Sequence, residues 1–95
     1  MPVFNLKLHD TYYKKGFFNV PVNFERYVRR DNGPVDLVLG ASGQTIQGRV
    51  DRNANSNGTP RVRGGAALRD WFQSNFLPKA TVDVDLGSRT SIRLR

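Results

Sequence analysis

The sequence predicts a mainly β protein, a seven-stranded open antiparallel pseudobarrel with two short helices, built by residues 1–95 as a single domain. Three observations lead to this fold class. Seven short segments have the composition and alternation of strands. The two helical segments do not alternate regularly with the strands, which excludes a doubly wound parallel sheet. A chain of 95 residues supports one modest core, which a closed or partly open barrel provides.

The first two strands are predicted at residues 3–8 and 17–21. The first alternates apolar and polar side chains, as a half-buried strand does, and the second is rich in β-forming residues and is closed by Pro21. Between them, residues 10–16 are polar and basic and end at a glycine. We therefore expect a projecting basic loop between the two strands.

Two short helices are predicted by the spacing of large apolar residues. The first begins at Asn23, a suitable N-cap, and its apolar residues recur at i, i+3 and i+4 before "DNGP" ends it. The second covers residues 66–76 and is stopped by Pro78. Its apolar stripe consists of Leu68, Trp71, Phe72 and Phe76. We expect the single tryptophan to lie in the core.

The middle strands are predicted to form a hairpin with a long polar tip. "VDLVLG" and "TIQGRV" are strands joined by the turn "ASGQ", and the alternation in the second strand places Arg49 outward. In the strand after the tip, Val62 faces inward, while Arg61 and Arg63 share the outer side. The tip, "DRNANSNGTP", therefore projects from a stem that carries arginines.

A second hairpin closes the chain. "TVDVDL" and "TSIRLR" alternate cleanly around the turn "GSR". Their predicted buried face consists of Val82, Val84, Leu86, Ile92 and Leu94. Asp83 is expected to lie across from Arg93, so the charges of this hairpin partly cancel. The unopposed positive charge therefore falls on residues 10–16 and 49–63.

The charge balance indicates a polyanionic partner. The formal net charge is +7 and the pI is about 10.6, which on a chain of this size points to nucleic acid or an anionic membrane. Eleven of the 15 basic residues are arginines. Because the planar guanidinium matches phosphates and guanine edges, this bias favours recognition over solubility alone.

The composition also restricts the chemistry. The chain has no cysteine, so disulfides and thiolate metal sites are excluded. No apolar run is long enough to span a bilayer, and the N-terminal residues lack the pattern of a signal peptide. We expect a soluble cytoplasmic protein, nucleoid-associated if bacterial, with no membrane partner and no cofactor.

Two motifs carry a resemblance to a known family. "FFNVP" resembles a second strand that ends in an aliphatic residue and proline, and "LRDWFQSNFLPKATVDVDL" resembles an aromatic-rich helix followed by a strand. Both are similar to the B3-like DNA-binding pseudobarrel of plant auxin-response-type transcription factors and of EcoRII-like restriction endonucleases. The resemblance covers nearly the whole chain. It departs at Lys79 and Ala80, where a Gly-Asp pair is common, and this bears on the turn type.

The resemblance implies that two arms grip DNA in the major groove. By position, the N-terminal arm is residues 10–15 and the C-terminal arm is residues 49–63, the two regions of unopposed positive charge. The candidate DNA-binding residues are Asp10, Tyr12, Tyr13, Lys14, Lys15, Arg49, Arg52, Asn53, Asn55, Asn57, Arg61 and Arg63.

The residue types in the arms suit both phosphate and base contacts. Arg52, Arg61 and Arg63 can each offer two parallel donors to guanine, and the asparagines of the tip can pair with adenine. The lysines of the first arm suit phosphate. The asparagines are also ordinary turn residues. One of Tyr12 and Tyr13 is expected to belong to the core, because adjacent strand residues face opposite ways.

We therefore expect sequence-specific recognition of double-stranded DNA. The short N-terminus and the absence of plant-type extensions favour the target-recognition domain of a bacterial restriction endonuclease, with a fused or associated nuclease domain. A transcription-factor-type DNA-binding domain is an alternative. A small barrel that stacks single-stranded nucleic acid on aromatic rings is another, and a module that binds an acidic protein is a third.

No complete catalytic or metal-binding set is visible in the sequence. His9 is the only histidine, so no histidine pair forms and no nucleophile has an oriented base. Asp83 and Asp85 lie on the closing hairpin with arginines opposite, which does not suit a nuclease metal site. We expect the chain to be non-catalytic on its own and to hold no metal.

Overall fold

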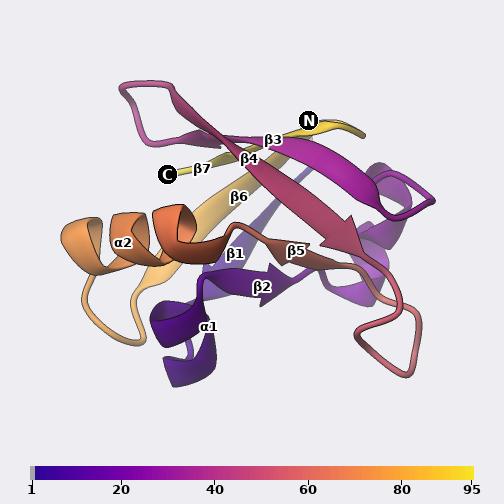
Figure 1. Ribbon diagram of the computed structural model, residues 1–95, viewed down its shortest axis with the longest axis horizontal. Helices are drawn as coiled ribbons and strands as arrows, with labels where there is room; N and C mark the ends of the chain where they lie inside the picture. Colours follow the sequence, from indigo (N-terminus) through magenta and orange to yellow (C-terminus); the bar gives the residue numbers. More distant parts are fainter. Residues whose placement is uncertain (1) are drawn as a thin grey trace.

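The computed structural model describes residues 2–95 and confirms a mainly β pseudobarrel (Figure 1). Its strands are β1 (Val3–Lys7), β2 (Phe17–Asn19), β3 (Gly33–Leu39), β4 (Gln44–Asp51), β5 (Arg61–Arg63), β6 (Thr81–Ser88) and β7 (Ser91–Leu94). They form one sheet in the order β1-β6-β7-β3-β4-β5-β2, with β1 and β2 at its edges. The neighbouring strands are antiparallel except for β3 and β7, which pair in parallel. The prediction of an antiparallel sheet thus holds for all neighbours but one pair.

Residues 2–95 form three helices beside the sheet, where the sequence predicted two. They are α1 (Asp10–Lys15), the 3-10 helix η1 (Val22–Tyr27) and α2 (Gly65–Asn75). The two predicted helices are present as η1 and α2, although η1 begins at Val22 and has Pro21 rather than Asn23 at its N-cap. None of the helices within residues 2–95 is long and apolar enough to cross a membrane.

The prediction of a loop over residues 10–16 was wrong, because α1 occupies this segment. Asp10 stands in its first turn and Lys14 and Lys15 in its last, an arrangement that complements the helix dipole. Gly16 ends the helix in the left-handed conformation, with φ of 75°, and its amide donates to the Tyr12 carbonyl. The helix buries no residue completely, so the sequence has no apolar periodicity that would predict it.

Helix α2 contributes the predicted apolar stripe to the core. Leu68 and Phe72 are fully buried. Trp71 and Phe76 are half-buried and meet edge to face, with ring centroids 5.2 Å apart. The prediction that the tryptophan lies in the core is therefore corrected, since Trp71 packs at the margin of the core rather than within it.

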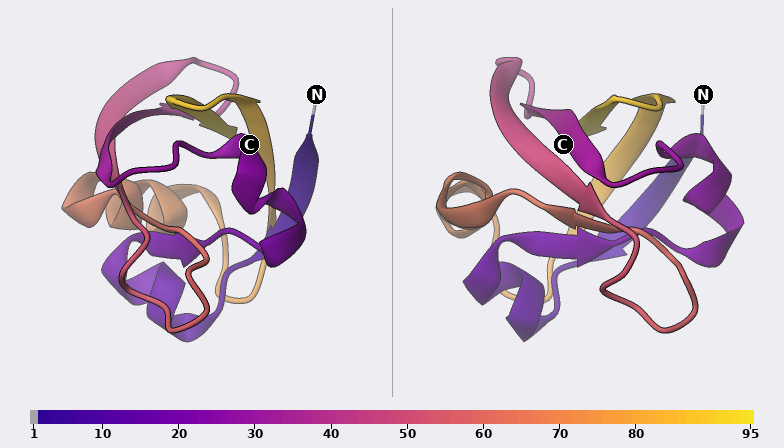
Figure 2. Two further views of the ribbon diagram at one scale, coloured as in Figure 1. Left: turned by 90° about the vertical axis from the view of Figure 1, so that its right-hand side faces the viewer. Right: turned by 45° about the vertical axis from the view of Figure 1, so that its right-hand side comes forward.

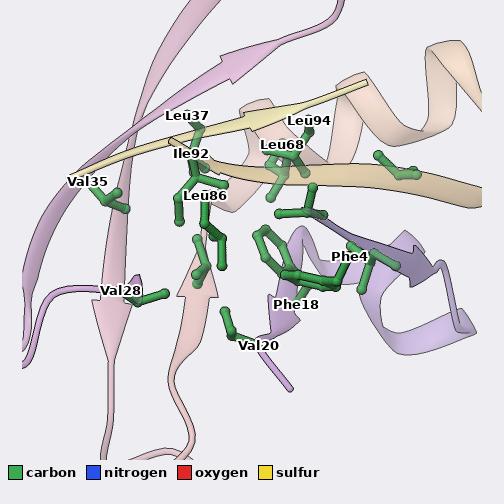
Figure 3. Packing of buried hydrophobic residues seen from close by; sticks show 14 of the residues in the cluster. Phe4, Phe18, Val20, Val28, Val35, Leu37, Leu68, Leu86, Ile92 and Leu94 are labelled. Carbon is green, nitrogen blue, oxygen red and sulfur yellow. The ribbon is translucent and has the colours of Figure 1, made fainter. Parts of the chain in front are cut away.

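The core is a single cluster enclosed by the curved sheet and α2 (Figure 3). Phe18 of β2 and Phe72 of α2 are its largest fully buried side chains. The predicted buried face of the closing hairpin is confirmed, because all five of its apolar residues lie in this cluster. Burial of apolar side chains at alternate positions therefore sets which faces of the strands turn outward.

The register of the closing hairpin differs from the prediction. Arg93 lies opposite Asp85, not Asp83, and the backbone of Asp83 exchanges hydrogen bonds with that of Arg95. Between the Asp85–Arg93 and Ser88–Ser91 pairs, β6 has one residue more than β7. The observed register differs from the predicted one by two residues, since Arg93 pairs with Asp85 instead of Asp83. A shift of two residues keeps every side chain on its predicted face. The charges still partly cancel, since Arg95 lies 3.6 Å from the Asp85 carboxylate.

Candidate nucleic-acid interface

Strands β4, β5 and β2 lie side by side and carry a row of outward side chains between two projections. Arg49 of β4 pairs with Arg63 of β5, which pairs with Phe17 of β2. In the next outward row, Asp51 of β4 pairs with Arg61 of β5, which pairs with Asn19 of β2. We call these six outward side chains the strand face. The buried valines between the two rows confirm the prediction that Val62 faces inward and the arginines outward.

The two projections flank the strand face. Residues 52–60, here called the arm, form a loop that leaves the barrel between β4 and β5 (Figure 2). Helix α1 immediately precedes β2 and lies at the other end of the β2–β5 pair, and it projects on the same side of the barrel as the arm (Figure 1). The structure thus brings the two predicted basic segments to one side of the molecule.

The ring of Phe17 supports two arginine side chains of the strand face. The guanidinium of Arg61 lies over its ring at 4.4 Å, and that of Arg63 lies at 5.9 Å. Tyr12 of α1 packs edge-on against the same ring, with centroids 5.5 Å apart. Phe17 is 9% exposed although it lies on the outer side of the sheet. Cation–π attraction, about 0.5–1 kcal/mol at an exposed site, therefore holds the arginines over a fixed surface.

A hydrogen-bond network joins the arm to the strand face. Arg61 donates through Nε to the Asn19 side-chain oxygen at 3.1 Å and through Nη2 to the Asn55 side-chain oxygen at 3.3 Å. The Asn55 amide donates in turn to Asn19 at 3.0 Å and to the Thr59 carbonyl at 3.1 Å. Asn55 is consequently engaged inside the arm and holds Arg61 in place.

The other two arm asparagines differ in their surroundings. The Asn57 side-chain oxygen accepts hydrogen bonds from the Thr59 amide and hydroxyl, which closes a local turn. The Asn53 side chain is exposed and makes no hydrogen bond to another of residues 2–95. Of the three asparagines, Asn53 is therefore the one whose whole side-chain amide is available to an external partner. In Asn57, only the side-chain NH₂ group is available.

Arg52 was predicted to offer its guanidinium to a base, but its side chain does not point outward from the arm. Its guanidinium folds back onto η1, where Nη1 donates to the Glu25 carboxylate at 2.7 Å. Nε and Nη2 donate to the carbonyls of Arg29, Glu25 and Val28 at 2.8 to 3.0 Å. The side chain is 16% exposed. Because these bonds occupy the guanidinium, Arg52 fastens the root of the arm to η1 instead of offering parallel donors to a base.

Asp51 is the one acid of the strand face. Its carboxylate accepts a hydrogen bond from the backbone N–H of Asn53 at 2.9 Å and from Arg63 at 3.3 Å. The backbone N–H of Asn53 is the main cause that holds the pKa of Asp51 below its ordinary value, and Arg63 and Arg61 lower it further. A depressed pKa means that these contacts stabilise the fold above the ordinary pKa and are lost as the pH falls through the lower folded value. At neutral pH the face therefore carries three arginines against one carboxylate.

If the strand face binds duplex DNA, as the sequence predicts, substitution Asp51→Asn is expected to strengthen binding to duplexes of any sequence by about two- to fivefold. Asparagine keeps an oxygen that accepts from the backbone N–H of Asn53. It removes the negative charge, which would repel phosphate and which pairs with Arg63. Fluorescence anisotropy with random-sequence duplexes at low salt measures the change. Unchanged or weaker binding by a folded variant would show that the strand face does not meet the phosphates.

Helix α1 is joined to the rest of the barrel beside the strand face by hydrogen bonds at both Gly16 and Tyr13. The Gly64 amide donates to the Gly16 carbonyl at 2.9 Å, and a Cβ on Gly16 would clash with the carbonyl of Gly65. The Tyr13 hydroxyl donates to the Phe76 carbonyl at 2.9 Å, which ties α1 to the end of α2. Lys14 and Lys15 stay exposed in the last turn, and Asp10 stays exposed in the first.

Both tyrosines are partly buried, whereas only one of them was predicted to belong to the core. The expectation relied on strand alternation, whereas a helix presents adjacent residues 100° apart and allows both to pack. Tyr12 lies against Phe17 and Tyr13 against α2. The two rings thus support the interface and leave the lysines as the exposed part of α1.

Two residues of the site were missed in the sequence. Phe17 and Asn19 organise the arginines of β5, yet they were assigned only to a strand. Strand alternation could have identified them, because Phe18 is buried and its two neighbours must therefore face outward. Their pairing with β5 could not be read from a strand of three residues.

The fold is shared with known structures. No family model matches the sequence, and no curated protein matches it significantly. A hypothetical protein of Arabidopsis thaliana superposes with a TM-score of 0.70 at 14% identity, over 99% of this chain and 87% of that one. The N-terminal domain of Helicobacter pylori LlaJI.R1 superposes with a TM-score of 0.67 at 11% identity, over 99% of this chain and 79% of that one. At these identities the likeness establishes a common barrel-like architecture.

Proposed function

We propose that this chain is a sequence-specific double-stranded DNA-binding domain of the B3-like type, which enters the major groove with α1 and the arm. The observation that carries the proposal is the strand face, on which Arg61 and Arg63 lie over Phe17 between two projections. Preorganised guanidinium groups lose little conformational freedom when they bind. Arginine forks match both phosphate oxygens and the O6 and N7 atoms of guanine.

The contacts divide into reading and positioning roles. Arg61 and Arg63, with Asn53 at the start of the arm, meet base edges. Lys15 and Arg49, together with Lys14, are exposed at the margins and meet phosphates. Arg52 and Asn55 are no longer among the proposed readers, because their polar groups are engaged within the protein.

We further propose that the domain supplies target recognition to a separate nuclease domain in a bacterial restriction system. The resemblance of its sequence motifs to B3-like recognition domains supports this. The fold also occurs as an N-terminal domain in the protein from Helicobacter pylori, which fits a recognition module joined to other parts. Cleavage in such a system belongs to the nuclease domain.

Covered aromatic rings argue against binding to single strands. Stacking of bases needs exposed rings. Phe17 is buried under arginines, and Tyr12 and Tyr13 are packed against the barrel. A duplex, whose backbone and groove edges meet arginines and lysines, is the better match.

Selection of bound duplexes from a random pool, followed by sequencing, tests the proposal. We expect enrichment of one short motif, and we expect duplex to compete better than single strand for the bound protein. A pool that stays random would refute sequence-specific recognition. Salt-independent binding, or none, would favour a module for a protein partner.

Substitution Lys15→Ala is expected to weaken binding to every duplex alike, by about threefold, and to lower the salt slope by about 1. Lys15 is exposed at the end of α1 and meets phosphate, which carries no sequence information. Titrations at several salt concentrations, with Arg95→Gln as a charge-matched control at the end of β7, measure both quantities. A change of base preference would instead make Lys15 a reader.

A further inference from the structure

A cavity of about 530 Å³ lies beside the root of the arm, outside the strand face. Its lining consists of Glu25, Arg26, Tyr27, Arg30, Arg52 and Arg89. These residues come from η1, the segment after it, the start of the arm and the β6–β7 turn. The Arg29 amide donates to the Arg89 carbonyl at 3.1 Å, so the β6–β7 turn is joined directly to the η1 segment. We call this site the basic cavity.

The charges of the basic cavity are not balanced within the protein. Glu25 is its one acid and is paired with Arg52 at 2.7 Å. Arg30 and Arg89 are exposed, and their side chains make no hydrogen bond or ion pair with another of residues 2–95. Within the described part of the chain, the Arg26 side chain donates one hydrogen bond, to the Tyr27 hydroxyl at 3.3 Å, and its guanidinium lies 5.1 Å from the centroid of the Tyr27 ring. Three arginines therefore surround one cavity without a counter-charge.

A neighbouring carboxylate does not supply that charge. Asp31 is adjacent to Arg30 in sequence, but both of its oxygens accept hydrogen bonds from Arg29, at 3.1 and 3.2 Å. The remaining cations repel one another, and an anion in the cavity would relieve the repulsion. Guanidinium groups from three segments can surround a tetrahedral anion with several donors.

We propose that the basic cavity binds a phosphate group. Arginine offers paired donors that match phosphate oxygens, and the volume is large enough for a phosphate that carries a sugar or a base. Two sources share this chemistry: a backbone phosphate of DNA that extends past the arm, and the phosphate of a free nucleotide. Arg52 links the cavity to the arm root, but its donors are already engaged, so Arg26, Arg30 and Arg89 provide the binding charge.

Titration with inorganic phosphate tests the site without DNA. Shifts of arginine side-chain resonances are followed by NMR at constant ionic strength, with chloride as the reference anion. We expect saturable shifts confined to the lining of the basic cavity. Arg30→Gln combined with Arg89→Gln is expected to weaken phosphate binding at least about tenfold. Arg95→Gln, an exposed arginine outside the cavity, is expected to leave it unchanged.

Duplex titrations separate the two sources. If the phosphate belongs to DNA, the double variant weakens binding to long duplexes, lowers the salt slope by about 2 and keeps the base preference. If it belongs to a free nucleotide, inorganic phosphate binds while duplex affinity changes only as it does for Arg95→Gln. The proposal is overturned if neither phosphate shifts nor duplex affinity distinguish the double variant from that control. This outcome leaves the strand face untested, so the two proposals fail independently.

Discussion

Replacing Arg52 with alanine is expected to lower the free energy of unfolding by about 2–3 kcal/mol. The substitution removes four hydrogen bonds and leaves the Glu25 carboxylate without its partner. It also leaves three η1-segment carbonyls without the donor that satisfies them. Urea denaturation of the wild type and the variant measures the loss.

Arg52→Lys is the matched control for this site. Lysine keeps the charge for Glu25 but lacks the planar fork that reaches three carbonyls at once, so we expect it to recover only part of the stability. Full recovery would reduce the role of Arg52 to the ion pair alone. Equal stability of Arg52→Ala and the wild type would contradict the fastening role altogether.

DNA binding by Arg52→Ala distinguishes a role of Arg52 in holding the arm from a role in base recognition. We expect Arg52→Ala to weaken binding to all duplexes in parallel, because a loosened arm root misplaces the whole hairpin. The base preference from a random pool should stay the same. A relaxed preference without a loss of stability would return Arg52 to the set of residues that read bases.

Replacing Arg61 with alanine is expected to weaken binding to the selected target by roughly 10- to 100-fold. Binding to random duplex should fall far less. The guanidinium lies over Phe17, and Asn19 and Asn55 orient it, so its removal deletes a preorganised pair of donors. Competitive anisotropy with the target and with random duplexes measures the two losses.

Two comparison variants make this result specific. Arg49→Ala removes the same charge from the neighbouring strand and should weaken target and random duplexes equally. Asn55→Ala loosens the arm network but keeps Arg61, which shows how much of the loss comes from a disordered arm. Equal losses on target and random duplexes for Arg61→Ala would refute its assignment as a reader.

Most strands were predictable because their information is local. A buried side chain at every second position defines β1, β3, β6 and β7, and alternation also places the stem arginines outward. The order of elements then excludes a parallel doubly wound sheet and leaves a barrel. The register was less predictable, as Asp83 shows, because an irregularity near the end of β6 changes the pairing without changing the apolar alternation that precedes it.

Helix α1 shows where local information ends. None of its six side chains is completely buried, so α1 lacks the apolar stripe from which α2 was predicted. Its stability comes from the left-handed Gly16 and from packing of Tyr12 and Tyr13 on β2 and α2. A helix of this length is marginal without tertiary contacts, and a polar, glycine-terminated segment resembles a loop.

The strand pattern of the β4–β5 hairpin, with its inward valines and outward arginines, follows from the sequence alone, because backbone periodicity depends only on neighbouring residues. The partners of each arginine, in contrast, depend on the three-dimensional fold. Arg52 meets Glu25, 27 residues away, and Arg61 meets Asn19, 42 residues away. A long, flexible side chain takes the partner that folding brings within reach, and that partner is not encoded in its own segment of the chain.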